Sequence, residues 1–529
     1  MKNWLRFLYP NVLATLLGIS LAFAFAPYEI FPLAFIAPAG LLALWLNASP
    51  LRAFRLGFLF GVGLFGAGIY WIFYSIHYMG DVPSWIAFII TAGLIAILAL
   101  FPASVGYLLN RYFPITNDSK ILCAFPAIWV IIEWIRSWIF TGFAWLFLGY
   151  SQTNSPLKGY APILSVYGVS LAVVVTSALI VNSVIYFRRK NFQTFYFNLF
   201  AIIVIWLAGS LLNLIPWTNI SGKALTINLV QGNIPQELKW SPDHIQLSLD
   251  RYKDLTEPLW GKSDFIIWPE AAVPMPLAEA TSFIELLDKK AKESGTSLIL
   301  GIPVEADDGK NYHNAVITLG KTQQSYYKRR LVPFGEYVPF ERISSYIFNF
   351  LGVPISNLTP GKWGQDPMLI DGTKILTSIC YEITYPELTK SNDRDIGFIL
   401  TVTNDAWFGE SSAQAQHLQM AEMRAIELKR PVVFVSNDGI TAIVNADGNI
   451  QAAVPPHQIA VLKGTVQPMS GLTPWMRNGM NLILFILLCL FITAFKNARQ
   501  VPLVSALAVK EDKRTEENNN ATMMQNPKA

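Results

Sequence analysis

Cys380 is the residue in this sequence best placed to act as a nucleophile. Of the three cysteines, Cys123 and Cys489 fall in long apolar segments, where a small apolar-behaving side chain needs no further explanation. Cys380 instead ends a strand-like run, ILTSIC, and the YEITYPEL that follows is typical of a turn into a helix. A nucleophile at such a turn is exposed beside backbone N–H groups that can stabilise an oxyanion. For Cys380 alone, a buried structural role is an equally good interpretation.

Two ionisable residues of the same half of the chain occur in comparable settings. Glu270 closes the run FIIWPE, which would place a carboxylate at a strand end. Lys328 lies in YYKRRLVPFGEYVP, ahead of an uncharged stretch and Glu336. Most glutamates and lysines are simply solvated, so neither residue alone indicates a site. Their occurrence together with Cys380 suggests a Glu-Lys-Cys group.

The first 220 residues have the composition of a membrane region. Hydrophobic residues make up 53% of the 529-residue chain and charged residues 14%, yet only four of the 36 acidic residues lie in this part. A helix needs about 20 apolar residues to cross a bilayer. We therefore predict eight membrane spans, at about 8–26, 30–47, 57–76, 84–109, 121–149, 161–187, 195–215 and 479–495.

Basic residues between these segments predict their orientation. They precede the first span, lie in alternate connections and follow the eighth span, whereas the other connections before residue 216 carry only Lys158. Both termini are then cytoplasmic, and the block between spans seven and eight faces outward. A second span follows the first at once and no cleavage signal is obvious, so we expect the first to be retained.

The outward block has the pattern of an α/β domain. Strand-like runs such as ALTINLV, DFIIW, KILTSI and GFILTV alternate with helical patterns at Ser282–Glu293 and Ala413–Lys429. The predicted organisation is a seven-helix membrane region at 1–219, the outward domain at 220–470, the eighth span with its flanks at 471–499, and a disordered polar tail at 500–529.

Motifs around these residues resemble the nitrilase superfamily, in which WPE (268–270), the Lys328 segment and CYE (380–382) occur in this order. Longer motifs narrow the resemblance: LVQGNIPQELKW (229–240), LVPFGEYVP (331–339), TNDAWFG (403–409), SNDGITAIV (436–444) and EWIRSWIFTGFAWLFLGYSQ (133–152). With the eight spans, they make the chain similar to the bacterial apolipoprotein N-acyltransferase family over nearly its full length. Only the tail beyond about residue 500 has no evident counterpart.

This resemblance implies a four-layer αββα sandwich for the outward domain and a two-step reaction through a covalent intermediate. An acyl chain would pass from a phospholipid, typically phosphatidylethanolamine, to the cysteine as a thioester. It would then pass to the α-amino group of the diacylglyceryl-cysteine that begins an apolipoprotein. The implied location is a bacterial inner membrane with the domain in the periplasm, and no cofactor is implied.

The resemblance also implies catalytic roles. Glu270 would be the general base for the Cys380 thiol and later for the attacking amine. The Lys328 ammonium would favour the thiolate and, with the backbone N–H of Tyr381, would stabilise the tetrahedral oxyanion.

Three further residues match positions of the family motifs. Glu336 and Glu382 match acidic positions, where they would orient Lys328 and the turn that carries the nucleophile. Trp240 matches the last position of a QxxKW motif and would help to hold the lipid substrates.

Two other functions remain open from the sequence. A membrane-anchored amidohydrolase would use the same three residues with water as the acceptor, and a transporter or receptor would use the outward domain only for binding. A net charge of +4 without a long basic run indicates no nucleic-acid partner. The five histidines show no metal-ligand spacing, so we predict no metal.

Two membrane-related features complete the sequence predictions. Glu133 and Arg136 stand three residues apart in an apolar segment, and charges within a membrane are usually paired or functional. We favour a structural ion pair between them. The aromatic run Tyr346–Leu351 would either dip into the lipid or act as a gate, or it would complete the domain core.

Overall fold

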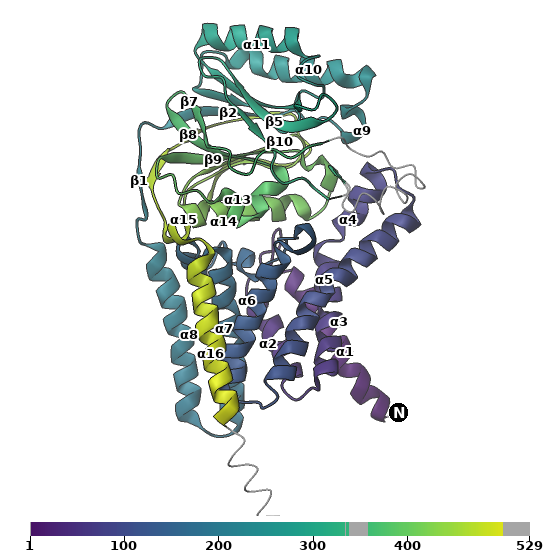
Figure 1. Ribbon diagram of the computed structural model, residues 1–529, viewed down its shortest axis with the longest axis vertical. Coiled ribbons are helices and arrows are strands. Elements are labelled where there is room, and N and C mark those ends of the chain that lie inside the picture. The colour runs from purple at the N-terminus through teal and green to yellow at the C-terminus, as the bar shows by residue number, and fades with distance from the viewer. Residues whose placement is uncertain (1, 334, 338–357, 501–529) are drawn as a thin grey trace, which may run out of the picture.

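The computed structural model describes residues 2–333, 335–337 and 358–500, and the run at 346–351 lies outside these ranges. A bundle of helices stands below two stacked β-sheets (Figure 1). Helices α1 (Lys2–Ala22) and α16 (Met480–Gln500) place the two ends of the described chain at the end of the bundle away from the sheets.

Apolar helices make up the bundle: α1, α2 (Leu33–Trp45), α3 (Pro50–Gly68), α4 (Trp71–Tyr74), α5 (Ser84–Tyr112), α6 (Phe125–Arg136), α7 (Ala161–Arg188), α8 (Phe192–Asn213) and α16. Within the described ranges, 5 helices are long and apolar enough to cross a membrane: Pro50–Gly68, Ser84–Tyr112, Pro156–Arg188, Phe192–Asn213 and Met480–Asn497. Two further apolar helices, Leu8–Ala22 and Leu33–Trp45, are shorter. The predicted apolar helical region is confirmed, whereas the predicted number of eight spans is not.

The segment predicted as a span at 121–149 is not one helix, because α6 ends at Arg136. The Arg136 guanidinium donates to the carbonyl oxygen of Trp145 at 2.7 Å, and Glu133 Oε1 accepts from the Leu148 N–H at 3.0 Å. No ion pair joins Glu133 and Arg136 in the described structure, so that prediction was wrong. Their charged groups instead hydrogen-bond the backbone at 145–148, an irregular segment that ends at the start of the 3-10 helix Leu148–Gln152 and whose polar groups need partners when no water is near.

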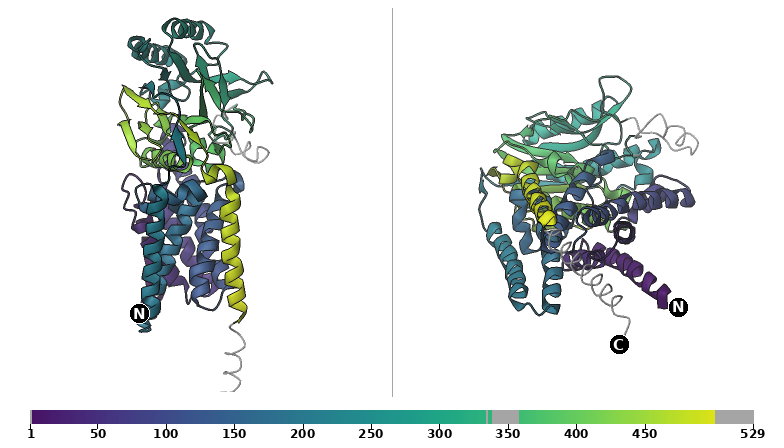
Figure 2. Two further views of the ribbon diagram at one scale, coloured as in Figure 1. Left: turned by 90° about the vertical axis from the view of Figure 1, so that its left-hand side faces the viewer. Right: turned by 60° about the horizontal axis from the view of Figure 1, so that its bottom comes forward.

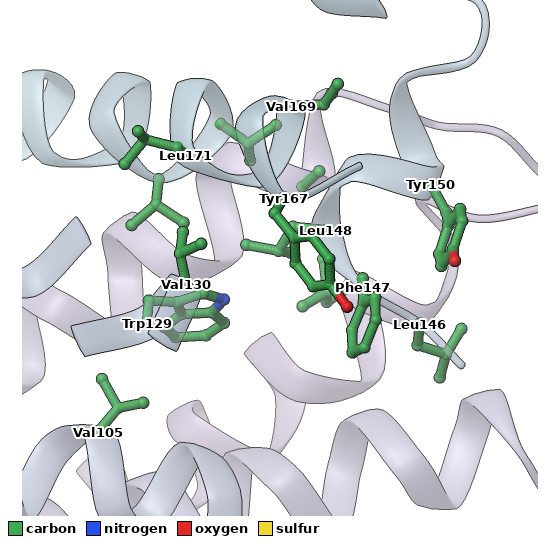
Figure 3. Close-up of a cluster of buried hydrophobic side chains, with 14 of the residues drawn as sticks. Val105, Trp129, Val130, Leu146, Phe147, Leu148, Tyr150, Tyr167, Val169 and Leu171 are labelled. Carbon is green, nitrogen blue, oxygen red and sulfur yellow. The ribbon is translucent and has the colours of Figure 1, made fainter. Parts of the chain in front are cut away.

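This non-helical segment is packed among the helices. Figure 3 shows Leu146, Phe147 and Leu148 in a buried apolar cluster, with Phe147 beside Tyr167 of α7. The two rings have their centres 5.6 Å apart. The buried charged groups of Glu133 and Arg136 and the buried apolar side chains together fix this part of the chain relative to the bundle.

The domain above the bundle contains two six-stranded sheets. The first has the order β13-β2-β3-β4-β5-β6, formed by Ala460–Val466, Leu225–Gln231, Phe265–Ile267, Ser297–Glu305, Tyr312–Leu319 and Ser325–Tyr327. The second has the order β12-β11-β10-β9-β8-β7, formed by Ile450–Val454, Thr441–Val444, Val432–Ser436, Ile396–Thr403, Thr373–Ile379 and Met368–Ile370. Strands β2, β3 and β4 are parallel, as are β8, β9 and β10. Every residue of β9 is buried, as its continuous apolar sequence predicts for a central parallel strand.

Three apolar cores show the order of the layers. Leu249 of α10 (Pro242–Thr256) and Leu287 of α11 (Thr281–Ser294) pack with Leu298 on the outer face of the first sheet. A second core fills the space between the two sheets. Leu418 of α14 (Ala413–Leu428) packs with Ile399 on the outer face of the second sheet. The layers therefore follow the expected order α, β, β, α, with α14 facing the bundle (Figure 2, left).

Candidate active site

The three residues suggested as a group all lie at or just beyond the ends of strands. Glu270 follows β3 after Trp268 and Pro269, Lys328 follows β6 directly, and Cys380 follows β8 directly. Strands β3 and β6 belong to the first sheet and β8 to the second, so the site is built where the two sheets meet. Rigid strands thus position each side chain.

The Lys328 ammonium binds two carboxylates. Only 1% of its side chain is exposed, and its Nζ lies 3.1 Å from Glu270 Oε1 and 2.8 Å from Glu336 Oε1. The Asn314 side-chain amide on β5 donates to the same two oxygens, at 2.7 Å and 3.2 Å. One cation and one amide therefore hold both glutamates in a water-poor cluster.

This arrangement determines the charge states of the cluster. Burial would raise the pKa of Glu270, but Lys328, the Asn314 hydrogen bond and Lys239 outweigh it and lower the pKa below its ordinary value. Burial would lower the pKa of Lys328, but Glu270 and Glu336 raise it well above its ordinary value. The carboxylate and the ammonium are both charged at neutral pH.

Cys380, the predicted nucleophile, has a strained backbone. Its φ is +53°, a left-handed conformation that is unfavourable for a residue with a side chain, and it opens the 3-10 helix η7 (Cys380–Thr384). The side chain is partly exposed. Burial and the Glu270 charge raise the pKa of the Cys380 thiol well above its ordinary value, although Lys328 opposes this. The expected effect of Lys328 is therefore present, but it does not by itself produce a thiolate.

Glu382 joins the nucleophile turn to the Lys328 segment. It is fully buried, and its Oε2 accepts from the Ile379 N–H at 2.8 Å and from the Tyr326 hydroxyl at 2.8 Å. Its Oε1 accepts from the Arg329 N–H at 2.7 Å. These bonds connect the residues that flank Cys380 and Lys328: the bond to Ile379 stays at the end of β8, whereas the bonds to Tyr326 and Arg329 reach β6 of the first sheet and the residues after it.

The loop that follows α6 in the bundle contacts the nucleophile turn. The hydroxyls of Tyr381 and Tyr385 both donate to the carbonyl oxygen of Gly142, at 3.2 Å and 3.1 Å. The Arg330 guanidinium donates to the carbonyl oxygen of Thr141. The site is therefore attached on one side to the membrane helices.

Lys239 is a site residue that the sequence predictions missed. It ends the short helix α9 (Gln236–Lys239), is 2% exposed, and its Nζ donates to the Glu270 carbonyl oxygen at 3.1 Å. Burial lowers the pKa of Lys239 to about 8, against the opposing effects of Glu270 and Cys380. Trp240, the predicted lipid contact, is the next residue, and it is 50% exposed. Lys239 thus connects the QxxKW motif to the site.

The cluster has the parts needed for acyl transfer through a covalent intermediate. The Cys380 thiol lies close enough to the buried Glu270 carboxylate and Lys328 ammonium for both charges to affect its pKa. In the portion of the chain that the structure describes, no group of three or more His, Cys, Asp or Glu side chains is arranged to hold a metal ion.

Comparisons with known proteins show which families and structures this chain is similar to. Residues 17–179 match the family described as "Apolipoprotein N-acyltransferase N-terminal domain", and residues 227–474 match the family "Carbon-nitrogen hydrolase". Among solved structures, a carbon-nitrogen hydrolase superfamily protein of Xanthomonas campestris is 20% identical and covers 46% of this chain and 91% of its own, with a TM-score of 0.36. An amidase of a Nesterenkonia species is 16% identical and covers 47% and 92%, with a TM-score of 0.34.

The domain and its site therefore define a carbon-nitrogen hydrolase (nitrilase-like) enzyme carried on a bundle of apolar helices. Two curated relatives are similar over almost their whole length. The apolipoprotein N-acyltransferase of Coxiella burnetii is 41% identical over 88% of this chain and 96% of its own, and that of Vibrio cholerae is 38% identical over 87% and 92%. The chain belongs to the apolipoprotein N-acyltransferase family.

Proposed function

We propose that this acyltransferase moves one acyl chain from a phospholipid, through a thioester on Cys380, to the α-amino group of a diacylated apolipoprotein. The observation that carries this proposal is the buried Lys328, which bridges Glu270 and Glu336 beside a half-buried thiol. This arrangement supplies a base, a cation and a nucleophile. We further propose phosphatidylethanolamine as the donor.

In the first half-reaction, Cys380 Sγ attacks the ester carbonyl carbon of the phospholipid. The raised pKa of Cys380 keeps the thiol protonated at rest, so Glu270 takes the proton as the S–C bond forms. The Lys328 ammonium and the Tyr381 N–H, which lies in the first turn of η7 where N–H groups have no partner within the helix, stabilise the oxyanion. The C–O bond then breaks, Glu270 returns the proton to the departing oxygen, and a lysophospholipid leaves.

In the second half-reaction, the α-amino nitrogen of the lipoprotein attacks the thioester carbonyl carbon. Glu270 takes a proton from this nitrogen as the C–N bond forms, and the same donors stabilise the second oxyanion. The C–S bond breaks, and the sulfur regains a proton from Glu270. The products are an amide and the free Cys380 thiol.

A membrane location suits both substrates. Transferring an acyl chain from lipid into water costs roughly 0.8 kcal/mol for each exposed CH₂, so a site attached to the bundle avoids extracting either substrate. The site contacts the loop after α6, and the exposed Trp240 ring lies one residue from Lys239, which suits a contact with lipid chains. We propose a bacterial inner membrane with the domain in the periplasm and both termini in the cytoplasm.

Intact-mass analysis of the purified protein after incubation with phosphatidylethanolamine tests the proposal. We expect an added acyl chain on the parent, none on Cys380→Ala, and loss of the adduct when a diacylated lipopeptide is added, with the acyl chain recovered as an amide. Release of free fatty acid in place of the amide would favour the hydrolase, and active protein without any adduct would contradict the thioester.

A further inference from the structure

A histidine–aspartate pair lies directly behind the nucleophile. His417 of α14 is fully buried, and its Nδ1 lies 3.0 Å from Asp405 Oδ1. Its Nε2 lies 3.2 Å from the backbone carbonyl oxygen of Cys380. Asp405 opens the 3-10 helix η8 (Asp405–Phe408), just beyond β9, and its Oδ1 also accepts from the Thr403 hydroxyl at 2.8 Å. The pair therefore connects β9 and α14 to the turn at Cys380.

The partners of the two His417 ring nitrogens show where hydrogens must lie. A carbonyl oxygen can only accept a hydrogen bond, so Nε2 must carry a proton to bind Cys380. The Nδ1 contact with Asp405 Oδ1 needs one proton between the two atoms. One hydrogen on Nε2 and one between Nδ1 and Oδ1 satisfy both contacts. This ring then acts as a donor to the nucleophile's own peptide group.

The same ring touches the membrane bundle. The indole of Trp145, in the loop after α6, has its centre 5.8 Å from the His417 ring. The Trp145 Nε1–H donates at 2.7 Å to Oε1 of Gln416, the residue before His417. Trp145 is 1% exposed, and its carbonyl oxygen binds Arg136 of α6. A chain of contacts thus runs from α6 through Trp145 and α14 to Cys380.

We propose that His417 is a positioning residue for acyl transfer: held by Asp405 and Trp145, it donates to the Cys380 carbonyl and fixes the left-handed turn that presents the thiol and the Tyr381 N–H. This role rests on the proposed function of Cys380 as the acyl carrier. A φ of +53° is unfavourable for cysteine, so the surrounding bonds must hold it. Glu382 holds the residue before the nucleophile, and His417 holds the carbonyl of the nucleophile itself.

The charge of the pair matters as well as its hydrogen bond. Besides Glu270, the Asp405 carboxylate raises the pKa of the Cys380 thiol, whereas Lys328 lowers it. The Thr403 hydroxyl donates to Asp405 Oδ1 at 2.8 Å, and His417 Nδ1 lies 3.0 Å from the same oxygen, so both contacts hold that carboxylate in place behind the turn.

Substitutions that separate hydrogen bonding from packing test this role. His417→Gln keeps an N–H donor near the Nε2 position, His417→Met keeps volume without a donor, and His417→Asn has a donor too short to reach the carbonyl. The readout is the rate of Cys380 alkylation by iodoacetamide, which needs no lipid substrate, in a background carrying Cys123→Ser and Cys489→Ser. His457→Gln is the matched control, because it alters a second His–Asp pair whose histidine is 38% exposed.

We expect His417→Met and His417→Asn to slow alkylation about tenfold or more, since small displacements of reacting groups cost large factors in rate. His417→Gln and His457→Gln should stay within about threefold of the parent, and the acyl-transfer kcat should follow the same order with little change in KM.

Equal rates for the Gln and Met variants, or a His417→Met rate close to the parent's, would overturn the proposal. Should the Met variant fail to fold, the Asn and Gln pair decides. A parent that is alkylated but never acylated would count against the proposed function alone.

Discussion

At the scale of single residues, the site depends on one buried cation shared by two carboxylates. Lys328 lies between Glu270 and Glu336, and removing one partner of a buried pair leaves the other charges without compensation. We expect Lys328→Met to lower the free energy of unfolding by about 3 kcal/mol or more. It should also slow formation of the acyl-enzyme by about 100-fold or more, as for loss of an oxyanion donor. Urea unfolding and single-turnover acylation measure the two effects.

A double substitution separates stability from catalysis at this position. Adding Glu336→Gln to Lys328→Met removes one of the two carboxylates left without a cation, so part of the lost stability should return. Acylation should not return, because the oxyanion still lacks its ammonium. A double variant no more stable than Lys328→Met would show that like-charge repulsion is not the cause.

Lys239 gives a prediction about pH. The pKa of Lys239 in the folded chain is about 8, below the ordinary 10.5. At a pH between 8 and 10.5 the unfolded chain therefore binds more protons at Lys239 than the folded chain does. The contribution of Lys239 to the free energy of unfolding thus rises with pH, by about 3 kcal/mol from pH 8 to 10.5. Lys239→Met lacks this rise and should exceed the parent in stability most clearly below pH 8. Thermal unfolding across this pH range tests it, with the exposed Lys262→Met as control.

Part of this site could be predicted from the sequence and the rest could not, for a physical reason. Glu270 and Cys380 each close an apolar run, and strand ends are where side chains can meet. Asn314, Lys239 and His417 are ordinary residue types within a strand or a helix, and their contacts with Glu270 or Cys380 join residues 31 or more positions apart. The QxxKW motif was the one available signal for Lys239, but it directed attention to Trp240.

At the scale of elements, the alternation of strands and helices was sufficient to predict an α/β domain, and the family resemblance implied the αββα sandwich. The helix predicted at Ala413–Lys429 is α14, which ends at Leu428. The membrane spans were less predictable, because apolar composition does not distinguish a continuous helix from the buried irregular chain after Arg136. The helix can end there because Arg136 and Glu133 hydrogen-bond the carbonyl and N–H groups of the following chain. The amino-acid composition of the segment does not indicate these hydrogen bonds.

The turn carrying Glu270 gives a prediction at this scale. A Cβ on Gly301 of β4 would lie 2.5 Å from the Ala271 nitrogen and 2.7 Å from Glu270 Cα. Gly301→Ala must therefore displace the backbone that carries Glu270. We expect a loss of about 1–3 kcal/mol in stability from overpacking, and acylation of Cys380 slowed by about 100-fold through misplacement of the base. Gly364→Ala is the control, because its Cβ would meet open space; equal rates for both variants would contradict the prediction.

At the scale of the whole molecule, α14 joins the catalytic domain to the bundle. Apart from Ala415, all its residues are buried, although many are polar or charged. One face packs on the second sheet, while Met420, Met423 and Ile426 belong to the apolar core of the bundle. Glu427 Oε1 accepts from the Val166 N–H of α7 at 2.7 Å. The nucleophile, the sheets and the bundle are therefore fixed to one another through this helix.

Glu422 makes this junction sensitive to pH. It lies on α14, is 6% exposed, and burial together with the Glu29 carboxylate between α1 and α2 raises the pKa of Glu422 to about 8. An acid whose pKa is raised on folding contributes stability below its unfolded pKa, and this contribution is lost as pH rises through the folded value. Between pH 4.5 and 8 the parent should therefore lose up to about 5 kcal/mol from this group. Glu422→Gln stays neutral and should not show that loss.

We therefore expect Glu422→Gln to resemble the parent in thermal stability near pH 4.5 and to exceed it increasingly toward pH 8. Unfolding of detergent-solubilised protein, followed as Tm against pH, measures the difference, and Glu293→Gln on the exposed face of α11 should leave the parent curve unchanged. A constant difference between parent and Glu422→Gln at every pH would show that packing is responsible. The turn at Cys380 is supported from α14 through His417. If the junction holds the site together, heating at pH 8 should therefore lower the kcat of Glu422→Gln less steeply than the kcat of the parent.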